Sequence, residues 1–151
     1  MDKEQNLKSV SPIMSKLTTN CAIILIDDNE VDLYLNDRLI KHAALFSQVK
    51  TYRSAEPALD YLAALPGTEP GTHYPIIILL DIKMPETDGF WFVSRFEALP
   101  ASVKERCKVA MLSATLHVSD ALRAQANPTI DAFVNKPLTI KDLEKLLESV
   151  A

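Results

Sequence analysis

The chain has 151 residues, of which 48% are hydrophobic and 24% charged, and its formal net charge is −4. This length suits a single domain with a sizeable core, and the slight acidic excess argues against nucleic acid as a direct partner. The two cysteines, Cys21 and Cys107, are too few and too isolated for a disulfide framework or a zinc site, so we expect small buried or half-buried thiols.

The beginning of the chain, residues 1–20, is polar and rich in turn-forming residues. We expect it to be a flexible leader ahead of one domain over residues 21–151. It lacks the apolar core of a signal peptide, and the sequence contains no apolar stretch of membrane-spanning length. We therefore expect a cytoplasmic protein that does not contact a membrane.

Beyond the leader, short apolar runs alternate with segments of helical periodicity. The apolar runs have the length and composition of buried parallel strands. They predict strands at about Ala22–Ile26, Gln48–Tyr52, Ile76–Leu80, Lys108–Leu112 and Asp131–Val134. A helix is predicted after each strand, at about Glu30–His42, Ser54–Ala64, Phe90–Leu99, Ser119–Ala126 and beyond Thr139.

Residues at the ends of the helical segments indicate where the helices begin and end. Asp88 is placed to cap the third predicted helix, and Ser119 the fourth. The Pro-Gly pair at residues 66–67 is expected to end the second helix, and the Asn-Pro pair at residues 127–128 the fourth.

The first and last helices carry apolar residues at helical spacing. Thr139 and Asp142 resemble a capping box at the start of the last helix. The side chains predicted to be buried by that helix are Ile140, Leu143, Leu146 and Leu147. In the first helix, the residues near helical spacing are Val31, Tyr34, Leu35, Leu39 and Ala43.

Strand–helix alternation with short connections predicts an α/β fold, in which five βα units form a doubly wound parallel sheet with helices on both faces. The ligand site of such a sheet lies beyond the carboxyl ends of its strands. Four of the predicted strands run into polar side chains at that edge, which are Asp27 and Asp28, then Asp81, then Ser113, and finally Lys136.

These side chains suit phosphoryl transfer. If the first and third strands are neighbours, Asp27, Asp28 and Asp81 lie together and raise one another's pKa values, and a hard cation such as Mg²⁺ relieves their repulsion. The cation, the Lys136 ammonium and the Ser113 hydroxyl would then surround a carboxylate nucleophile and stabilise a phosphoryl group transferred to it.

Taken alone, each of these residues has a plainer explanation. The pair Asp27 and Asp28 also suits a solvated turn or the N-cap of the following helix. Asp81 also suits a loop, Lys136 a solvated surface, and Ser113 a cap or turn. The functional interpretation depends on all of them falling at the same end of successive strands.

Four segments, in order along the chain, carry a family resemblance. They are Ile23–Asp32 (IILIDDNEVD), Ile77–Gly89 (IILLDIKMPETDG), Val109–Thr115 (VAMLSAT) and Asp131–Leu138 (DAFVNKPL). Together they resemble the response-regulator receiver domain of bacterial two-component signalling, the CheY-like family, and its stand-alone members in particular. The resemblance implies a flavodoxin-like sheet of order 2-1-3-4-5, in which the first and third strands are neighbours.

The resemblance assigns roles at the reaction centre. Asp81 stands at the phosphoacceptor position, and Lys136 at that of the phosphate-binding lysine. The family binds Mg²⁺, with Mn²⁺ as an alternative. The ligands implied here are the side chains of Asp27, Asp28 and Asp81 and the backbone carbonyl of Lys83.

Other matching positions concern switching and the lifetime of the phosphoryl group. Ser113 stands at the switch hydroxyl, and Phe133 stands at the aromatic switch position in place of a frequent tyrosine. Pro137 matches a proline that usually follows a cis bond. Lys83 and Thr115 are expected to tune the phosphoryl lifetime, and a solvated lysine is an equal alternative for Lys83.

The function that the resemblance implies is a signalling switch rather than a conventional enzyme. A sensor histidine kinase or a histidine phosphotransfer protein would donate a phosphoryl group to Asp81. The added charge would repack the surface formed by residues 119–126, residues 131–134 and the last helix. No output domain is expected, so that surface would bind a downstream protein or a second copy of the chain, or the chain would pass the phosphoryl group onward. The chain would be a monomer or a phosphorylation-dependent dimer.

Three alternatives compete with this interpretation. A phosphatase of the haloacid-dehalogenase type needs Asp-x-Asp after its first strand, and here Lys83 stands at the second acid after Asp81. A flavodoxin-like cofactor binder needs a Ser-, Thr- and Gly-rich phosphate loop, where Asp27 and Asp28 would repel phosphate. A receiver that signals without phosphorylation would still bind its partner after the substitution Asp81→Asn.

Overall fold

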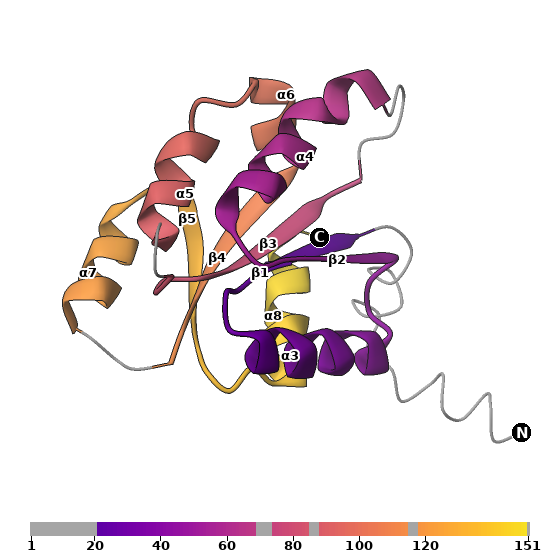
Figure 1. The fold of residues 1–151 in the computed structure, drawn as a ribbon, viewed down its shortest axis with the longest axis vertical. Helices are drawn as coiled ribbons and strands as arrows, with labels where there is room; N and C mark the ends of the chain where they lie inside the picture. The colour runs from indigo at the N-terminus through magenta and orange to yellow at the C-terminus, as the bar shows by residue number, and fades with distance from the viewer. Residues whose placement is uncertain (1–20, 69–73, 85–87, 115–117, 151) are drawn as a thin grey trace, which may run out of the picture.

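The computed structural model describes residues 21–68, 74–84, 88–114 and 118–150. Within these ranges, five parallel strands form one sheet in the order β2-β1-β3-β4-β5 (Figure 1), which confirms the predicted fold class and strand order. The strands are β1 (Ala22–Ile26), β2 (Gln48–Tyr52), β3 (Ile76–Asp81), β4 (Cys107–Ser113) and β5 (Ile130–Asn135).

Helices cover both faces of this sheet (Figure 1). The helices on one face are α3 (Glu30–Ala43) and α8 (Ile140–Val150). Those on the other face are α4 (Ala55–Thr68), α5 (Gly89–Phe96), the short α6 (Ala101–Lys104) and α7 (Val118–Ala126). The sheet is therefore the middle of three layers, as expected for a doubly wound fold.

The strands direct alternate side chains into two separate cores. In β1, Ile23 and Leu25 pack in the core beneath α3 and α8, whereas Ile24 and Ile26 pack in the core beneath α4, α5 and α6. Successive strand residues point to opposite faces, and both faces are covered, so every residue of β1 and β3 is buried. This is why both strands appear in the sequence as uninterrupted apolar runs.

The predicted end of the second helix is wrong. α4 continues through Pro66 to Thr68 instead of ending near Ala64. A proline in the last turn removes one backbone hydrogen bond. The fully buried Leu62 and the 2% exposed Leu65 hold that turn against the sheet, and their burial outweighs the loss.

The prediction of one helix over Phe90–Leu99 is also wrong at its end. α5 stops at Phe96, and α6 begins after Pro100. Proline favours the start of a new helix because its fixed φ is already helical and its missing N–H is not needed there. The sequence pattern did not indicate α6, since this single turn has one buried side chain, Val103.

Two of the three predicted helix caps are confirmed. Asp88 accepts a hydrogen bond of 2.9 Å from a backbone N–H in the first turn of α5. Thr139 and Asp142 form the capping box, in which each backbone N–H donates to the other side chain, at 2.9 and 3.2 Å. Ser119 is not a cap, because α7 already begins at Val118.

The last helix buries less than its sequence pattern predicts. The residues of α8 that are buried as predicted are Leu143, Leu146 and Leu147. Ile140 was expected among them but is 38% exposed. It is the first residue of the helix and lies at the polar edge of the sheet, where the apolar core ends.

Three of the five apolar residues that gave the first helix its periodicity lie outside the core, and the other two, Leu39 and Ala43, are half-buried against it. α3 packs on the sheet through Leu33 and Ile40. The residues of α3 that are 66%, 58% and 55% exposed are Val31, Tyr34 and Leu35. Because α3 carries two apolar stripes, periodicity alone does not tell which of them faces the sheet.

Both cysteines are free and buried, as predicted. Burial raises the pKa of Cys21 and of Cys107 to about 12. A thiol that stays protonated at neutral pH is a poor nucleophile and a poor metal ligand, so both residues act as small core side chains.

Gly89 allows α5 to begin close to the end of β3. Its N–H donates to the carbonyl of Ile82 at 2.8 Å. A Cβ at this position would lie 3.0 Å from Met111 Sδ and 3.1 Å from the Asp81 carbonyl oxygen, closer than ordinary contact.

We expect Gly89→Ala to lower the free energy of unfolding by about 1 to 3 kcal/mol, because the added methyl group overpacks this junction. Urea unfolding followed by circular dichroism measures the change. Ser94→Ala, at an exposed position of the same helix, should change stability little. Equal stability of the two variants would show that the close approach has no energetic consequence.

Candidate functional site

The polar residues predicted for the site meet at the carboxyl edge of the sheet. Asp27 follows the last residue of β1 and Asp81 ends β3, and the register of these neighbouring strands places them side by side. Ser113 ends β4, one residue beyond the partner of Asp81. Lys136 follows the last residue of β5, and its backbone N–H donates to the Ser113 carbonyl at 2.8 Å.

Three carboxylates form the centre of the site. Asp27, Asp28 and Asp81 each offer an oxygen, and these oxygens lie within 4.8 Å of one another. Asp27 is fully buried, and Asp81 is 6% exposed. Burial and the negative charge of Asp27 raise the pKa of Asp81 to about 7, although Lys136 acts in the opposite direction. Three hard oxygen donors at this spacing suit a small divalent cation, which would relieve the repulsion between them.

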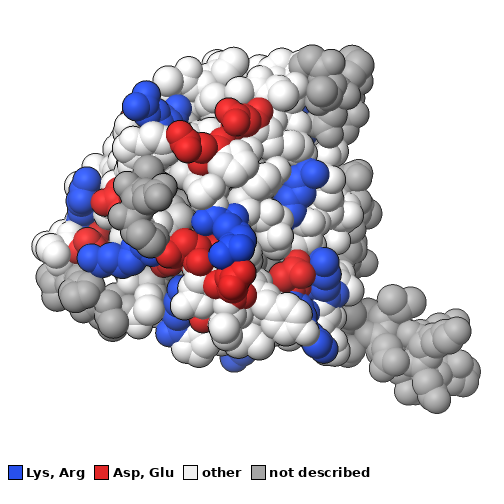
Figure 2. Space-filling model, in the orientation of Figure 1, with Lys and Arg blue, Asp and Glu red and all other residues white. Residues whose placement is uncertain are grey.

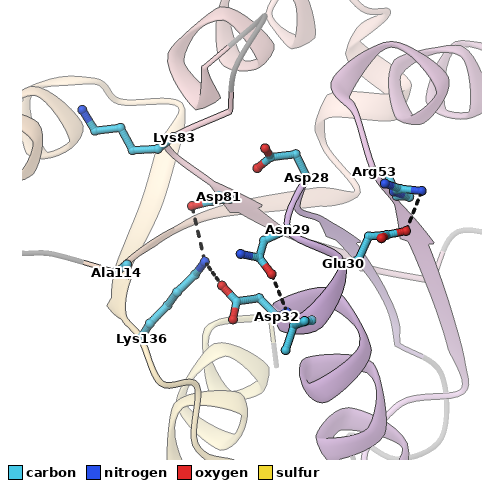
Figure 3. A pocket seen from close by; sticks show the side chains of 10 residues that line it. Asp28, Asn29, Glu30, Asp32, Arg53, Asp81, Lys83, Ala114 and Lys136 are labelled. Carbon is cyan, nitrogen blue, oxygen red and sulfur yellow. Dashed lines mark hydrogen bonds and ion pairs between the residues drawn. The ribbon is translucent and has the colours of Figure 1, made fainter.

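Lys136 lies among carboxylates (Figure 3). Its Nζ is 2.9 Å from Asp32 Oδ2, 3.2 Å from Asp27 Oδ2 and 3.7 Å from Asp81 Oδ1. Burial alone would lower the pKa of Lys136, but the hydrogen bond to Asp32 and the charges of Asp81 and Asp27 outweigh it and raise this pKa. The ammonium therefore keeps its charge at neutral pH.

Asp32 also lies at this candidate site, although it was not predicted from the sequence as a site residue. It lies in the first turn of α3, where its backbone N–H donates to the side chain of Asn29 at 3.0 Å. Asn29 is thus the N-cap, rather than Asp27 or Asp28, and its own N–H donates to Asp27 Oδ1 at 2.9 Å. Its position in the sequence could have indicated this role. An acidic residue in the first helical turn after a strand that carries site residues lies close to the ends of the strands.

The residues assigned to switching occupy the expected elements. Ser113 is 3% exposed at the end of β4, and Phe133 on β5 is half-buried against the core beneath α4, α5 and α6. The peptide bond between Lys136 and Pro137 is cis, which agrees with what the family resemblance implies for this proline. Thr115 lies outside the residues that the structure describes.

Lys83 presents its backbone and its side chain to different partners. A backbone hydrogen bond from Lys83 to the Asp81 carboxylate favours the charged carboxylate and lowers its pKa. The ammonium points away from Asp81 (Figure 3) and lies 3.9 Å from Asp120 Oδ2 at the start of α7. Its side chain is 70% exposed, as in the solvated alternative, and its role in tuning the phosphoryl lifetime stays a prediction.

An open depression of about 640 Å³ leads to the carboxylates and is lined by residues of both signs. At its rim, Arg53 and Glu30 form an ion pair of 2.9 Å. Figure 2 shows acidic and basic side chains interspersed over this view of the molecule, without a large area of one sign. A partner that approaches on this side therefore meets mixed charge.

A model of the response regulator receiver domain matches residues 23–148. The chain therefore belongs to the response regulator receiver family, whose members are phosphoacceptor signalling modules rather than conventional enzymes. This assignment decides against the phosphatase and the flavodoxin-like cofactor binder. Among the helices in the described ranges, none is both long enough and apolar enough to span a membrane.

Individual relatives agree with this assignment. The chain is 27% identical over 128 residues to the probable methanogenesis regulatory protein FilR2 of Methanothrix harundinacea, a match covering 85% of this chain and 79% of that protein. It is 24% identical over 128 residues to the response regulator Rcp1 of Synechocystis, covering 85% of this chain and 84% of that protein.

Solved structures show the same fold. A response regulator receiver protein from Dyadobacter fermentans superposes with a TM-score of 0.76 at 33% identity, over 85% of this chain and 96% of that one. A two-component response regulator from Cytophaga hutchinsonii gives a TM-score of 0.76 at 27% identity, over 87% of this chain and 96% of that one.

Proposed function

We propose that this chain is a phosphorelay switch in which Asp81 accepts a phosphoryl group from a phosphohistidine of a sensor histidine kinase or a histidine phosphotransfer protein. The observation that carries the proposal is the grouping around Asp81, which lies within 4.8 Å of Asp27 and Asp28 and 3.7 Å from Lys136 Nζ. A nucleophilic carboxylate, a pair of metal-binding acids and an ammonium are the groups that phosphoryl transfer to aspartate needs.

In the proposed reaction, Asp27, Asp28 and Asp81 would hold Mg²⁺ or Mn²⁺, and the backbone carbonyl of Lys83 would be a further ligand. The bound ion would neutralise charge on the phosphoryl oxygens. An oxygen of Asp81 forms a bond to phosphorus while the P–N bond to the donor histidine breaks, and the electron pair of that bond stays on the imidazole. Lys136 stabilises the negative charge of the transferred group.

The proposed switch follows from the charge that the phosphoryl group adds. Lys136 and the Ser113 hydroxyl move toward the phosphate, and the space that Ser113 leaves lets Phe133 repack. The surface affected is formed by α7, β5 and α8, on which Leu122 is 59% and Ile140 38% exposed. Its output is the binding of a downstream protein, dimerisation or onward phosphotransfer, with Lys83 and Thr115 tuning the phosphoryl lifetime.

We place the docking of the phosphodonor protein on α3. The exposed apolar side chains of this helix are Val31, Tyr34 and Leu35, and Val31 lines the opening of the site. A donor that covers this stripe would bury apolar surface and bring its histidine to Asp81. We also place the switch in the cytoplasm, with the receiver over residues 21–151 and a leader over residues 1–20, and the family match to residues 23–148 supports this division.

Intact-mass spectrometry after incubation with acetyl phosphate tests the proposal. The wild type is expected to gain one phosphoryl adduct that requires Mg²⁺, and Asp81→Asn is expected to gain none, because the amide is not a nucleophile. Asp60→Asn, at an exposed position of α4, should behave as the wild type does. No adduct on the wild type, or an equal adduct on Asp81→Asn, would contradict the proposal.

A further inference from the structure

We propose that Asp32 is the resting partner of Lys136 and competes with the phosphoryl group for it, so that Asp32 sets how fast Asp81 is phosphorylated and how long it stays phosphorylated. The inference rests on the proposed function, because it concerns the same site. Asp32 lies outside the carboxylate cluster of Asp27, Asp28 and Asp81. It acts through Lys136 and is therefore a positioning residue.

The distances place the resting ammonium nearer to Asp32 than to the acceptor. Lys136 Nζ lies 2.9 Å from Asp32 and 3.7 Å from Asp81. The first distance is that of a good charge-assisted hydrogen bond, and the second exceeds hydrogen-bond length. In the resting state, the group that is to bind the phosphoryl oxygens is therefore hydrogen-bonded elsewhere.

The backbone of Asp32 is held in place, so its carboxylate does not follow the lysine far. Its N–H is bonded to the cap residue Asn29 at 3.0 Å, and the next residue, Leu33, is buried against the sheet. Lys136, by contrast, has a flexible four-carbon stem. When an anion forms on Asp81, the lysine is the partner that moves.

Burial decides which contact of Lys136 breaks. The Asp27 side chain is fully buried, and leaving it without its cation would be costly. The Asp32 side chain is 38% exposed, so water solvates it when the lysine leaves, and such an exposed pair is easily broken. A phosphoryl group brings about −1.5 to −2 charge, so Lys136 exchanges Asp32 for it and keeps Asp27.

Glu30 provides a matched control for the charge of Asp32. It lies in the same first turn of α3 and lines the same opening. Its side chain is 69% exposed and pairs with Arg53 at 2.9 Å rather than with Lys136. Glu30→Gln therefore removes one negative charge near the site and leaves the Lys136 contacts in place.

The kinetic test uses acetyl phosphate and Mg²⁺ with the full chain, followed by intact-mass spectrometry. Asp32→Asn should accelerate phosphorylation of Asp81 and slow its dephosphorylation, each by about two- to fivefold, the range expected for a partly exposed ion pair. Glu30→Gln should change both rates less. Slower phosphorylation in Asp32→Asn, or equal changes in the two variants, would overturn the competition.

A second measurement separates this inference from the proposed function. Urea unfolding without metal or phosphodonor is compared for the wild type, Asp32→Asn, Lys136→Met and the double variant. We expect the change Asp32→Asn to lower stability more in the wild-type background than in the Lys136→Met background, because the ion pair is already lost when Lys136 is replaced. If the stability changes of the two single variants add up in the double variant, the Asp32–Lys136 contact of the resting state is absent and the inference is overturned. If the changes are coupled but the wild type gains no phosphoryl adduct, the contact stands and only the proposed function is refuted.

Discussion

Asp81→Asn is expected to raise the free energy of unfolding of the metal-free protein at pH 8 by about 2 to 4 kcal/mol. The wild-type carboxylate is buried beside Asp27, which raises the pKa of Asp81 from 3.8 to about 7. At pH 8 the folded protein therefore holds a charge that its surroundings disfavour, and the neutral amide removes this cost.

The sign of the pH dependence follows from the same shift. Between pH 3.8 and about 7, the folded protein keeps a proton on Asp81 that the unfolded chain releases. Stability from this group is therefore fully present below that window and is lost as the pH rises through it. The advantage of Asp81→Asn should accordingly shrink as the pH is lowered from 8 to about 4.

Urea unfolding in the presence of a chelator, at several pH values, measures this effect. Adding Mg²⁺ should stabilise the wild type by mass action and should stabilise Asp81→Asn much less. Asp60→Asn, an exposed acid of α4, serves as the control and should follow the wild type in both respects. An Asp81→Asn variant that is less stable than wild type at pH 8 would contradict the expected repulsion.

Lys136→Met is expected to destabilise the metal-free protein at neutral pH by about 3 to 5 kcal/mol, the usual cost of removing one member of a buried ion pair. The lysine side chain is 13% exposed, and the Asp27 carboxylate that it contacts is fully buried. Without the ammonium, Asp27 and Asp81 would face each other with no cation between them. This loss is a large fraction of the total stability of a domain of this size.

Chemical unfolding with chelator checks the expectation, and Lys141→Met, at an exposed position of α8, is the matched control. Added Mg²⁺ should recover part of the stability of Lys136→Met, because a divalent ion replaces the missing positive charge. It should not restore the proposed response to phosphorylation, in which the ammonium itself is expected to bind the phosphoryl group. Equal losses in Lys136→Met and Lys141→Met would show that the buried contacts carry no net energy.

The position of the site could be predicted from the residues, because it follows from where strands end, whereas the sheet order came from the family resemblance. Asp81, Ser113 and Lys136 were placed by the rule that parallel strands present their carboxyl ends at one edge, and the register confirms this. The rule does not predict how deeply each side chain is buried. It did not indicate that Asp27 is fully buried while Asp32 is 38% exposed.

The errors share a physical cause, which is that packing against neighbours overrides local signals. Pro66 looks like a helix end, but buried leucines keep its turn helical. Ile140 belongs to an apolar stripe, yet it lies where the core ends. The contacts that keep the turn at Pro66 helical come from the sheet, which is distant in sequence.

The division of the interior into two hydrophobic clusters has a consequence for how the sequence of this protein evolves. Ile24 and Phe92 belong to one cluster, and Ile23 and Leu143 to the other, with the sheet backbone between them. Substitutions at well-separated positions usually act additively. Sequence changes on one side of the molecule therefore do not require compensating changes on the other, so the side with α3 and α8 and the side with α4, α5 and α7 are free to diverge at different rates.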